Sequence, residues 1–367
     1  MQSISQPSKT AQFSLPLHGL RGIAVLIVLF SHLGNAAMPL APIPHDAIGK
    51  VGVWIFFSLS SFLLTRALYR SVSREASWWQ PLVSYGVHRV FRIYPLYVAV
   101  LLLHWLLGEL SAADVSRHLM LQQGEAELWA IPVEFKYYLV VPLVALAAQH
   151  VPVRWVSACL LGLLLLSLGY GVFHPVAVFS VELDLLPKLS PFLMGSLLAL
   201  HVDQLMSASE GHGAREGWTR HLLSLRGQIM VWGFFLSISV LFRAMIKADV
   251  TYQLAPLIAV LIAAATVALI LVSLHACTWT ASFLRARVLV FFGEISFSLY
   301  LLHMFFVHAM ERWGNAIPVF LQGWLVMAVC IPVSMLTYRY IERPGIQAGK
   351  YLGDKLNFAA SRRCLSS

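Results

Sequence analysis

The stretch "LAPLIAVLIAAATVALILVSL", Leu254 to Leu274, contains no charged side chain. A helix needs roughly 20 consecutive apolar residues to cross the hydrocarbon core of a bilayer. An uninterrupted run of this length is typical of a membrane span, because the surface helices of soluble proteins have a polar face. Similar runs recur along the whole chain. We therefore expect an all-α, polytopic membrane protein.

The composition agrees with this class. The chain has 367 residues, of which 59% are hydrophobic and 12% charged, and its mean hydropathy is +0.74. The first sixteen residues lack the compact apolar segment of a cleaved signal peptide, so we expect the first span to stay in the membrane. The four cysteines form no C-x-x-C pair, which indicates neither a disulfide framework nor a zinc site.

Apolar runs predict about ten transmembrane helices, at residues 17–36, 49–68, 93–110, 128–148, 155–173, 187–205, 228–246, 253–275, 289–309 and 317–338. This pattern divides the chain into a short cytoplasmic segment (1–16), a membrane domain (17–343) and a basic cytoplasmic tail (344–367). The tail is weakly amphipathic, and two alternatives stay open for it: contact with anionic lipid headgroups, or a solvated, frayed end.

The positions of the basic residues predict the orientation. With the N-terminus in the cytoplasm, eighteen Lys and Arg residues fall in cytoplasmic segments and six on the opposite side. Cytoplasmic loops carry an excess of Lys and Arg, so we expect both termini in the cytoplasm. The net charge of +9 is then largely a topology signal, and it does not indicate a nucleic-acid partner.

The first predicted span carries two titratable side chains, Arg21 and His32, in "LRGIAVLIVLFSH". Eleven residues at 100° each amount to about three turns plus 20°, so both side chains lie on one helix face. The helical rise separates them by about 16 Å. An interfacial anchor and a span end would explain the pair as well, but intramembrane ionisable groups usually face a cavity.

A second cationic pair lies in "HRVFRIYPLY", where Arg89 and Arg92 are three residues apart and adjacent on a helix surface. Positive-inside anchoring at the mouth of the third span would explain them. Guanidinium groups also bind phosphates through a planar fork of donors. Together with Arg21, the pair is a candidate site for a polyanionic ligand.

A carboxylate lies in the apolar segment "LWAIPVEFKYYLVVPL". Glu134 and Lys136 are two residues apart, so they point in different directions and need not pair. A buried carboxylate needs a partner, which for Glu134 could be an arginine or His32. The alternative to a functional role is a structural ion pair.

The C-terminal part adds weaker features. In "FFGEISFSLYLLHMFFVH" the spacing places Glu294 and His303 on opposite faces of one helix. In "RYIERPG" we expect Pro344 to end the last helix and Glu342 to pair with Arg343 at the interface. No metal-ligand spacing, no G-x-S-x-G and no phosphate-binding glycine loop occurs, so we expect no metal, no serine hydrolase and no nucleotide-driven transport.

Taken in order, the segments "LHGLRGIAVLIVLFSH", "FFSLSSFLLTR", "HRVFRIYPLY", "LWAIPVEFKYYL", "GEISFSLYLLH" and "IERP" resemble the acyltransferase 3 family of bacterial membrane acyltransferases, over residues 15–346. The resemblance implies a ten-span core in the bacterial inner membrane. It implies transfer of an acyl group, usually acetyl, from cytoplasmic acyl-coenzyme A to a hydroxyl of a carbohydrate, such as a surface glycan or a lipid-linked glycan. Acyl-coenzyme A is then a donor substrate, and no permanently bound cofactor is expected.

The resemblance also assigns residues. The family's basic residue and histidine fall on Arg21 and His32, its paired arginines on Arg89 and Arg92, and its carboxylate on Glu134. Two departures concern the acceptor more than the reaction. The family's "LSGF" reads "LSSF" here, with Ser61 in place of glycine, and Ala130 and Pro132 replace small polar residues. The chain ends soon after the last span, so we expect no fused esterase-like domain.

These assignments predict a mechanism. Arg21, Arg89 and Arg92 hold the phosphates of coenzyme A, and the pantetheine arm reaches toward His32, about 16 Å away. His32 acts as a general base on the acceptor hydroxyl or forms an acyl-histidine intermediate, and Glu134 orients the histidine or binds a sugar hydroxyl. Two rivals remain: a transporter or flippase without group transfer, and another class of membrane acyltransferase that uses His303.

Overall fold

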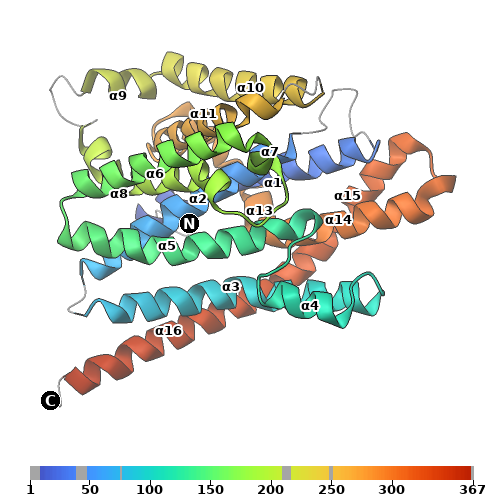
Figure 1. The fold of residues 1–367 in the computed structure, drawn as a ribbon, viewed down its shortest axis with the longest axis horizontal. Helices are drawn as coiled ribbons and strands as arrows, with labels where there is room; N and C mark the ends of the chain where they lie inside the picture. The colour runs from blue at the N-terminus through green and yellow to red at the C-terminus, as the bar shows by residue number, and fades with distance from the viewer. Residues whose placement is uncertain (1–8, 39–47, 75–76, 209–215, 248–250, 365–367) are drawn as a thin grey trace, which may run out of the picture.

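The structure is a computed structural model that describes residues 9–38, 48–74, 77–208, 216–247 and 251–364. Every regular element within these ranges is a helix (Figure 1). The longer helices are α1 (Lys9–Asn35), α2 (Gly49–Val72), α3 (Trp79–Leu106), α5 (Ala130–His150), α6 (Val153–Phe173), α8 (Leu189–Ala208), α10 (Leu225–Lys247), α11 (Thr251–Ser273), α14 (Ser296–Trp313), α15 (Val319–Thr337) and α16 (Arg343–Cys364). The shorter elements are α4 (Ala112–Leu119), η1 (Ala126–Trp129), α7 (Pro175–Phe179), η2 (Leu186–Lys188), α9 (Glu216–Leu223), α12 (Trp279–Leu284), α13 (Arg287–Glu294), η3 (Gly314–Ala316) and η4 (Tyr338–Glu342).

The predicted membrane architecture is confirmed. Within the described ranges, nine helices are long and apolar enough to cross a bilayer, and the bent pair α13 and α14 brings the number of spans to ten if it counts as one. The two halves of that pair meet at 74°. Glu294 and His303 therefore do not share one straight helix. The prediction from helical spacing that they lie on opposite faces of one helix does not apply to them.

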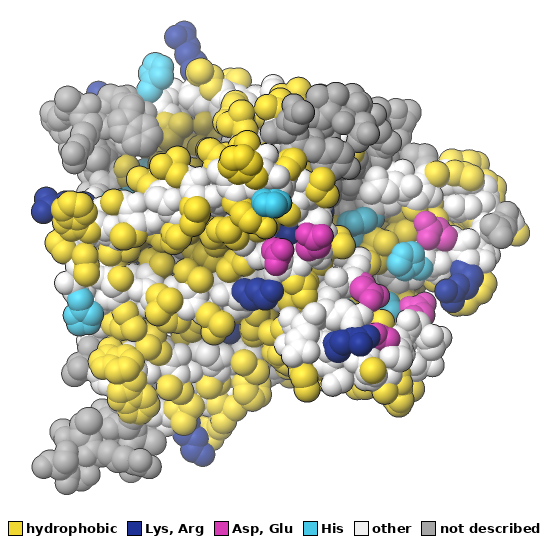
Figure 2. Space-filling model, viewed as in Figure 1, with side chains coloured by type: hydrophobic (Ala, Val, Ile, Leu, Met, Phe, Trp, Pro, Cys, Tyr) yellow, Lys and Arg dark blue, Asp and Glu magenta, His cyan; other side chains and the backbone are white. Residues whose placement is uncertain are grey.

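The helices form a bundle around α1 and α2. The apolar window of α2 is 78% buried inside the protein, whereas that of α10 is 17% buried. In Figure 1, α3 and α16 lie on one side of this centre, and α8, α10 and α11 lie on the other. Figure 2 shows hydrophobic side chains over the middle of the visible face and acidic side chains that gather toward the right of the view, over α4 and the adjoining end of α14, whereas basic side chains are scattered over the face.

Glycines let α1 pack directly against the backbone of the segment 284–294. A Cβ added to Gly22 would lie 2.1 Å from the carbonyl oxygen of Leu289, and one added to Gly293 would lie 1.9 Å from that of His18. Such distances are possible only without a side chain, and small residues are the usual means of close helix approach in membranes. This packing fixes the turn of α1 that carries Arg21.

Two sequence-based boundaries need correction. The third helix begins at Trp79 and not near residue 93, so Arg89 and Arg92 lie well inside a helix. The prediction that Pro344 ends the last helix is wrong, because α15, the π-helical turn η4 and α16 follow one another without a break. A proline is tolerated in the first turn of a helix, and the wide π turn just before Pro344 removes the need for a standard hydrogen bond there.

The tail continues as α16, which packs along α3 (Figure 1). A Cβ added to Gly345 would lie 2.6 Å from the carbonyl oxygen of Phe91, and one added to Gly349 would lie 2.7 Å from Phe91 Cβ. Neither alternative considered for the tail, headgroup contact or fraying, included this helix–helix contact.

Candidate active site

Four of the five sequence-predicted site residues line one cavity of about 440 Å³. Arg21 comes from α1, Arg89 and Arg92 from α3, and Glu134 from α5, so three helices contribute. The spacing within α3 and the face of α1 were readable from the sequence. The convergence of the three helices depends on the packing of the bundle. The cavity has a size typical of small-molecule sites.

Where the three arginines line the cavity, positive charge exceeds negative charge. Arg21 interacts electrostatically with Arg92, Glu134 and Glu342, and Arg89 interacts with Arg92 and Glu134. Three guanidinium groups therefore share two carboxylates. Nε of Arg89 is buried and has no hydrogen-bond partner in the described part of the chain. A buried donor without a partner indicates a place for a ligand, because leaving it unsatisfied is costly.

Glu342 is a site residue that the sequence interpretation missed. We expected it to pair with Arg343 at the interface. Its side chain is instead 1% exposed and accepts a hydrogen bond of 2.9 Å from Ser298 Oγ. Glu342 lies in the π-helical turn η4, and such turns are frequent at functional sites. The prediction of an interfacial pair is therefore wrong, and Glu342 acts as a buried counter-charge of the arginines.

The rest of this cavity is mainly apolar. Its walls include Phe56, Phe57, Leu63, Ile93 and Phe297. A cavity that is cationic at one place and apolar elsewhere suits an elongated ligand with a polyanionic head and an uncharged stem.

His32 lies apart from the arginines and contacts His303. Nε2 of His303 is 3.0 Å from Nδ1 of His32, and the ring centroids are 4.8 Å apart. His303 is 1% exposed. Sequence reasoning treated these two histidines as rival candidates, 271 residues apart in the chain. The structure joins them into one pair, which we call the histidine pair.

Backbone contacts define the tautomers of this pair. Nδ1 of His303 lies 2.6 Å from the carbonyl oxygen of Tyr300, and Nδ1 of His32 lies 3.0 Å from that of Val28. A carbonyl oxygen only accepts, so each Nδ1 carries the proton in a neutral ring. The single Nδ1–H of His32 is then shared between the Val28 carbonyl oxygen and Nε2 of His303, which both accept from it. The lone pair on Nε2 of His32 is left without a partner among the described residues.

The end of α1 next to His32 is held by the start of α2. The backbone N–H of Gly49 donates to Ser31 Oγ at 2.8 Å. Lys50 follows, with Nζ 3.8 Å above the centre of the Trp129 ring and 3.4 Å from the carbonyl oxygen of Ser180. Lys50 interacts electrostatically with His32. In the sequence, Lys50 is one of the six basic residues on the side opposite the cytoplasm, and no motif indicates that it lies beside His32.

Glu134 faces the arginines and not the histidine. It lines the 440 Å³ cavity, whereas His32 is not among that cavity's lining residues. Of the two partners considered for Glu134, the structure therefore selects the arginines. Lys136 points elsewhere and donates to the carbonyl oxygen of Leu183 at 2.6 Å, which agrees with the expectation that Glu134 and Lys136 do not pair.

The unusual Ser61 is accommodated by a glycine on a neighbouring helix. Ser61 Oγ donates to the carbonyl oxygen of Ser58 at 3.1 Å. A Cβ added to Gly195 would lie 2.1 Å from Ser61 Oγ and 2.3 Å from the Ser58 oxygen. Because Gly195 of α8 has no side chain, it leaves room for the Ser61 hydroxyl. The departure from "LSGF" therefore changes the packing of α2 on α8 very little.

The fold and this site define a polytopic α-helical membrane protein with an arginine-lined cavity in one half of the bundle and a buried histidine pair in the other. The chain belongs to the acyltransferase 3 family, whose sequence profile, described as an acyltransferase domain, matches residues 16–339. The resemblance drawn from the six motifs is confirmed.

Curated relatives are distant. A protein of Staphylococcus aureus strain MSSA476, provisionally named an O-acetyltransferase, is 24% identical over 92% of this chain. An O-acetyl transferase of Shigella phage Sf6 is 25% identical over 49% of this chain and 61% of its own length. The alignment covers 58% of the S. aureus protein, so this chain spans well under two thirds of that relative. No solved structure matches.

Proposed function

We propose that this chain is a membrane O-acetyltransferase that moves an acetyl group from acetyl-coenzyme A to a hydroxyl of a carbohydrate acceptor, such as a surface or lipid-linked glycan. One observation carries the proposal: Arg21, Arg89 and Arg92 converge on one apolar cavity, and the helix that supplies Arg21 supplies His32 about 16 Å further along. Family membership and the names of the relatives agree with this activity.

The cavity fits the donor in its chemistry. The phosphates of coenzyme A suit three guanidinium groups, of which Arg89 has a free buried donor. The uncharged pantetheine arm suits the apolar walls. Its length is of the order of the Arg21–His32 spacing, so a donor held at the arginines would present its thioester toward the histidine pair. In this proposal the arginine end faces the cytoplasm of a bacterium, and the chain lies in the inner membrane.

The tautomers support His32 as the general base. Nε2 of His32 takes the proton of the acceptor hydroxyl while the hydroxyl oxygen attacks the thioester carbonyl carbon. A C–O bond forms, the C–S bond breaks, and the thiolate leaves with the electron pair of the C–S bond. The proton on His32 then passes to that thiolate, which leaves as coenzyme A. His303 accepts the Nδ1–H hydrogen bond and holds the ring in position, and Lys50, which lies beside His32, is the candidate hydrogen-bond donor to the carbonyl oxygen.

Glu134 is assigned a positioning role. Its electrostatic interactions with Arg21 and Arg89 suit a carboxylate that holds the guanidinium groups in a fixed arrangement. A direct contact with His32 or with a sugar hydroxyl, as the sequence allowed, has less support because Glu134 lies in the arginine-lined cavity.

The test uses membrane vesicles that contain the full chain, acetyl-coenzyme A labelled in its acetyl group, and an envelope extract from cells that lack the gene. We expect labelled, base-labile ester and free coenzyme A thiol to appear in equal amounts, since each transfer releases one thiol. Uptake of an extract component without thiol release would contradict the proposal and favour the transporter alternative.

A further inference from the structure

A second cavity, of about 530 Å³, lies between the C-terminal end of α3, α4, η1 and the end of α14. It is at the end of the bundle away from the arginines, since α3 carries Arg89 in its first half and His104 in its last turn. His104, His118 and His308 line it. We call it the outer cavity. Neither the fold nor the family assignment gives it a role.

Two histidines of this cavity have an unsatisfied atom, because Nε2 of His104 and Nε2 of His118 have no hydrogen-bond partner among the described residues, and His118 is the more deeply buried of the two. His118 is fully buried, at 0% exposure, and lines the outer cavity. Its Nδ1 lies 3.2 Å from Tyr97 Oη, but Nε2 has no hydrogen-bond partner among the described residues. Burial lowers the pKa of His118 below its ordinary value, so its ring is neutral at physiological pH. A neutral imidazole nitrogen facing a cavity without a partner indicates that a ligand supplies one.

The lining is hydrogen-bonding and mainly acidic. Glu109, Glu125 and Glu311 line the outer cavity beside the buried Glu127; Arg312 is the one Lys or Arg in this lining, and Glu109 already pairs with His104 at 2.6 Å. This balance disfavours phosphates or any other polyanion. Carboxylates and imidazoles hydrogen-bond well to the hydroxyls of a polyol. A metal ion is a weaker alternative, because no group of three or more His, Cys, Asp or Glu side chains among the described residues is placed to hold one.

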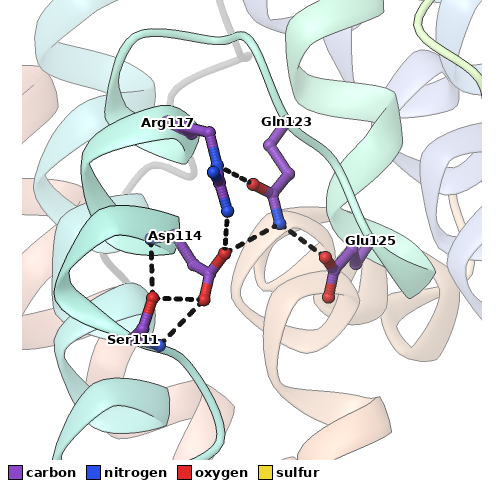
Figure 3. Close-up of polar contacts among 5 residues, drawn as sticks. All are labelled: Ser111, Asp114, Arg117, Gln123 and Glu125. Carbon is purple, nitrogen blue, oxygen red and sulfur yellow. Dashed lines mark hydrogen bonds and ion pairs between the residues drawn. The ribbon is translucent and has the colours of Figure 1, made fainter.

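The wall of the outer cavity next to α4 is braced by a hydrogen-bond network (Figure 3). The Ser111 hydroxyl and backbone N–H both donate to the Asp114 carboxylate, and they hold the pKa of that carboxyl well below its usual range. Arg117 donates to Asp114 and to Gln123, and Gln123 donates to the Glu125 carboxylate. The network connects α4 to the segment before η1. Glu125 is therefore fixed in the wall.

The outer cavity reaches the histidine pair through a short series of contacts. Glu127 lines the cavity, and its carbonyl oxygen accepts a hydrogen bond of 2.7 Å from Tyr300 Oη. The carbonyl oxygen of Tyr300 in turn accepts from Nδ1 of His303. Tyr300 also lines the arginine-lined cavity. The two cavities thus lie on either side of Tyr300, and the histidine pair lies next to this partition.

We propose that the outer cavity binds the acceptor, and that its chemistry selects a neutral or amino sugar hydroxyl over an acidic sugar. This inference rests on the proposed acetyltransferase function. It places donor and acceptor in separate cavities at opposite ends of the bundle, with the histidine pair between them. The acceptor hydroxyl and the thioester then meet at the histidine pair beside Tyr300, where the hydroxyl oxygen attacks the carbonyl carbon directly, and coenzyme A leaves on the arginine side.

Two substitutions at His118 separate ligand binding from a structural role. An asparagine amide can replace Nδ1 of histidine, whereas a glutamine amide can replace Nε2. If Nε2 binds the acceptor, His118→Asn keeps the Tyr97 contact and raises KM for the envelope extract at least tenfold, and His118→Gln is the milder change. If His118 only supports the fold through Tyr97, the order reverses, which would overturn the assignment.

Glu311→Gln removes a carboxylate of the cavity without changing its size. We expect a rise in KM for the extract of about tenfold with unchanged KM for acetyl-coenzyme A. Glu182→Gln is the matched control, because Glu182 is an exposed carboxylate that lines neither cavity. Wild-type KM for the extract in Glu311→Gln and in both His118 variants would overturn the proposal while leaving the acetyltransferase function intact.

The type of acceptor is tested on the product. After labelling with wild-type protein, the envelope extract is partially hydrolysed and the sugar that bears the acetyl ester is identified by mass spectrometry. A neutral or amino sugar is expected, and an acetylated uronic acid or phosphorylated sugar contradicts the charge argument. If the wild-type chain transfers no label to any component, the proposed function itself fails, and the acceptor assignment fails with it.

Discussion

At the scale of single residues, the histidine pair gives the sharpest prediction. His32→Ala removes the nitrogen with the free lone pair, and we expect a loss of about 10²–10⁴-fold in kcat with unchanged binding of acetyl-coenzyme A. His303→Ala removes only the acceptor of the Nδ1–H bond, so its loss of kcat is smaller, and His303→Gln restores part of it. Acetyl transfer assays and calorimetry of donor binding measure both effects. Full activity in His32→Ala, with none in His303→Ala, would reverse the two roles.

The arginines give a second prediction at this scale. Arg89→Ala and Arg92→Ala each remove a charge-assisted hydrogen bond to a phosphate, which is worth about 1.5–3 kcal/mol. We expect KM for acetyl-coenzyme A to rise about tenfold or more while kcat changes little. Arg154→Ala is the control, since Arg154 is exposed and outside both cavities. Unchanged KM in both α3 variants would exclude them as phosphate ligands.

The sequence predicts single residues well where a local rule applies and poorly where distant helices meet. Helical spacing places Arg21 and His32 on one face, and the structure keeps that helix intact. The contact of His32 with His303 depends on how α1 packs against α14, which no local pattern contains. Glu342 was misjudged for the same reason, because its burial arises from a π turn and a partner in another helix, Ser298.

At the scale of elements, glycine contacts determine how helices approach. Gly22→Ala would place a Cβ about 2.1 Å from the Leu289 oxygen, so α1 must move away from α13. Overpacking of this kind typically costs about 1–3 kcal/mol of unfolding free energy. We expect a lower thermal midpoint and, because Arg21 is the preceding residue, weaker donor binding. In the control Gly162→Ala the added Cβ has no neighbour within 4 Å, so stability is expected to be equal or higher. A midpoint in Gly22→Ala equal to that of the control would contradict this packing.

The helix boundaries that the sequence predicted incorrectly share a physical cause. Hydropathy detects the part of a helix that is apolar enough for lipid, and the first turns of α3, with His88, Arg89 and Arg92, are too polar to register. The protein holds these three side chains half-buried between helices. The continuation through Pro344 was missed because the rule for proline assumes α-helical hydrogen bonding, and the π turn before it changes that pattern.

At the scale of the whole molecule, the two cavities require a definite orientation. If the arginine-lined cavity binds acetyl-coenzyme A as proposed, it must face the cytoplasm, because this donor is a cytoplasmic metabolite whose charge prevents it from crossing a bilayer. The distribution of Lys and Arg in the sequence predicts the same orientation from independent data. The outer cavity, at the other end of α3, then faces the opposite side, where a surface glycan is accessible.

This orientation is tested with single cysteines in a variant whose four native cysteines are replaced. Glu182 and Asp354 are both exposed, and they lie toward opposite ends of the bundle: Glu182 is in the loop that Lys50 and Lys188 contact, and Asp354 is next to His88. We expect Glu182→Cys to react with a membrane-impermeant maleimide in intact cells, and Asp354→Cys to react only after permeabilisation. Each cysteine serves as the control of the other, and retained acetyl transfer shows that both variants are folded. The reverse labelling pattern would mean that the arginine-lined cavity faces away from the cytoplasm. It would therefore contradict the assignment of this cavity as the site of acetyl-coenzyme A.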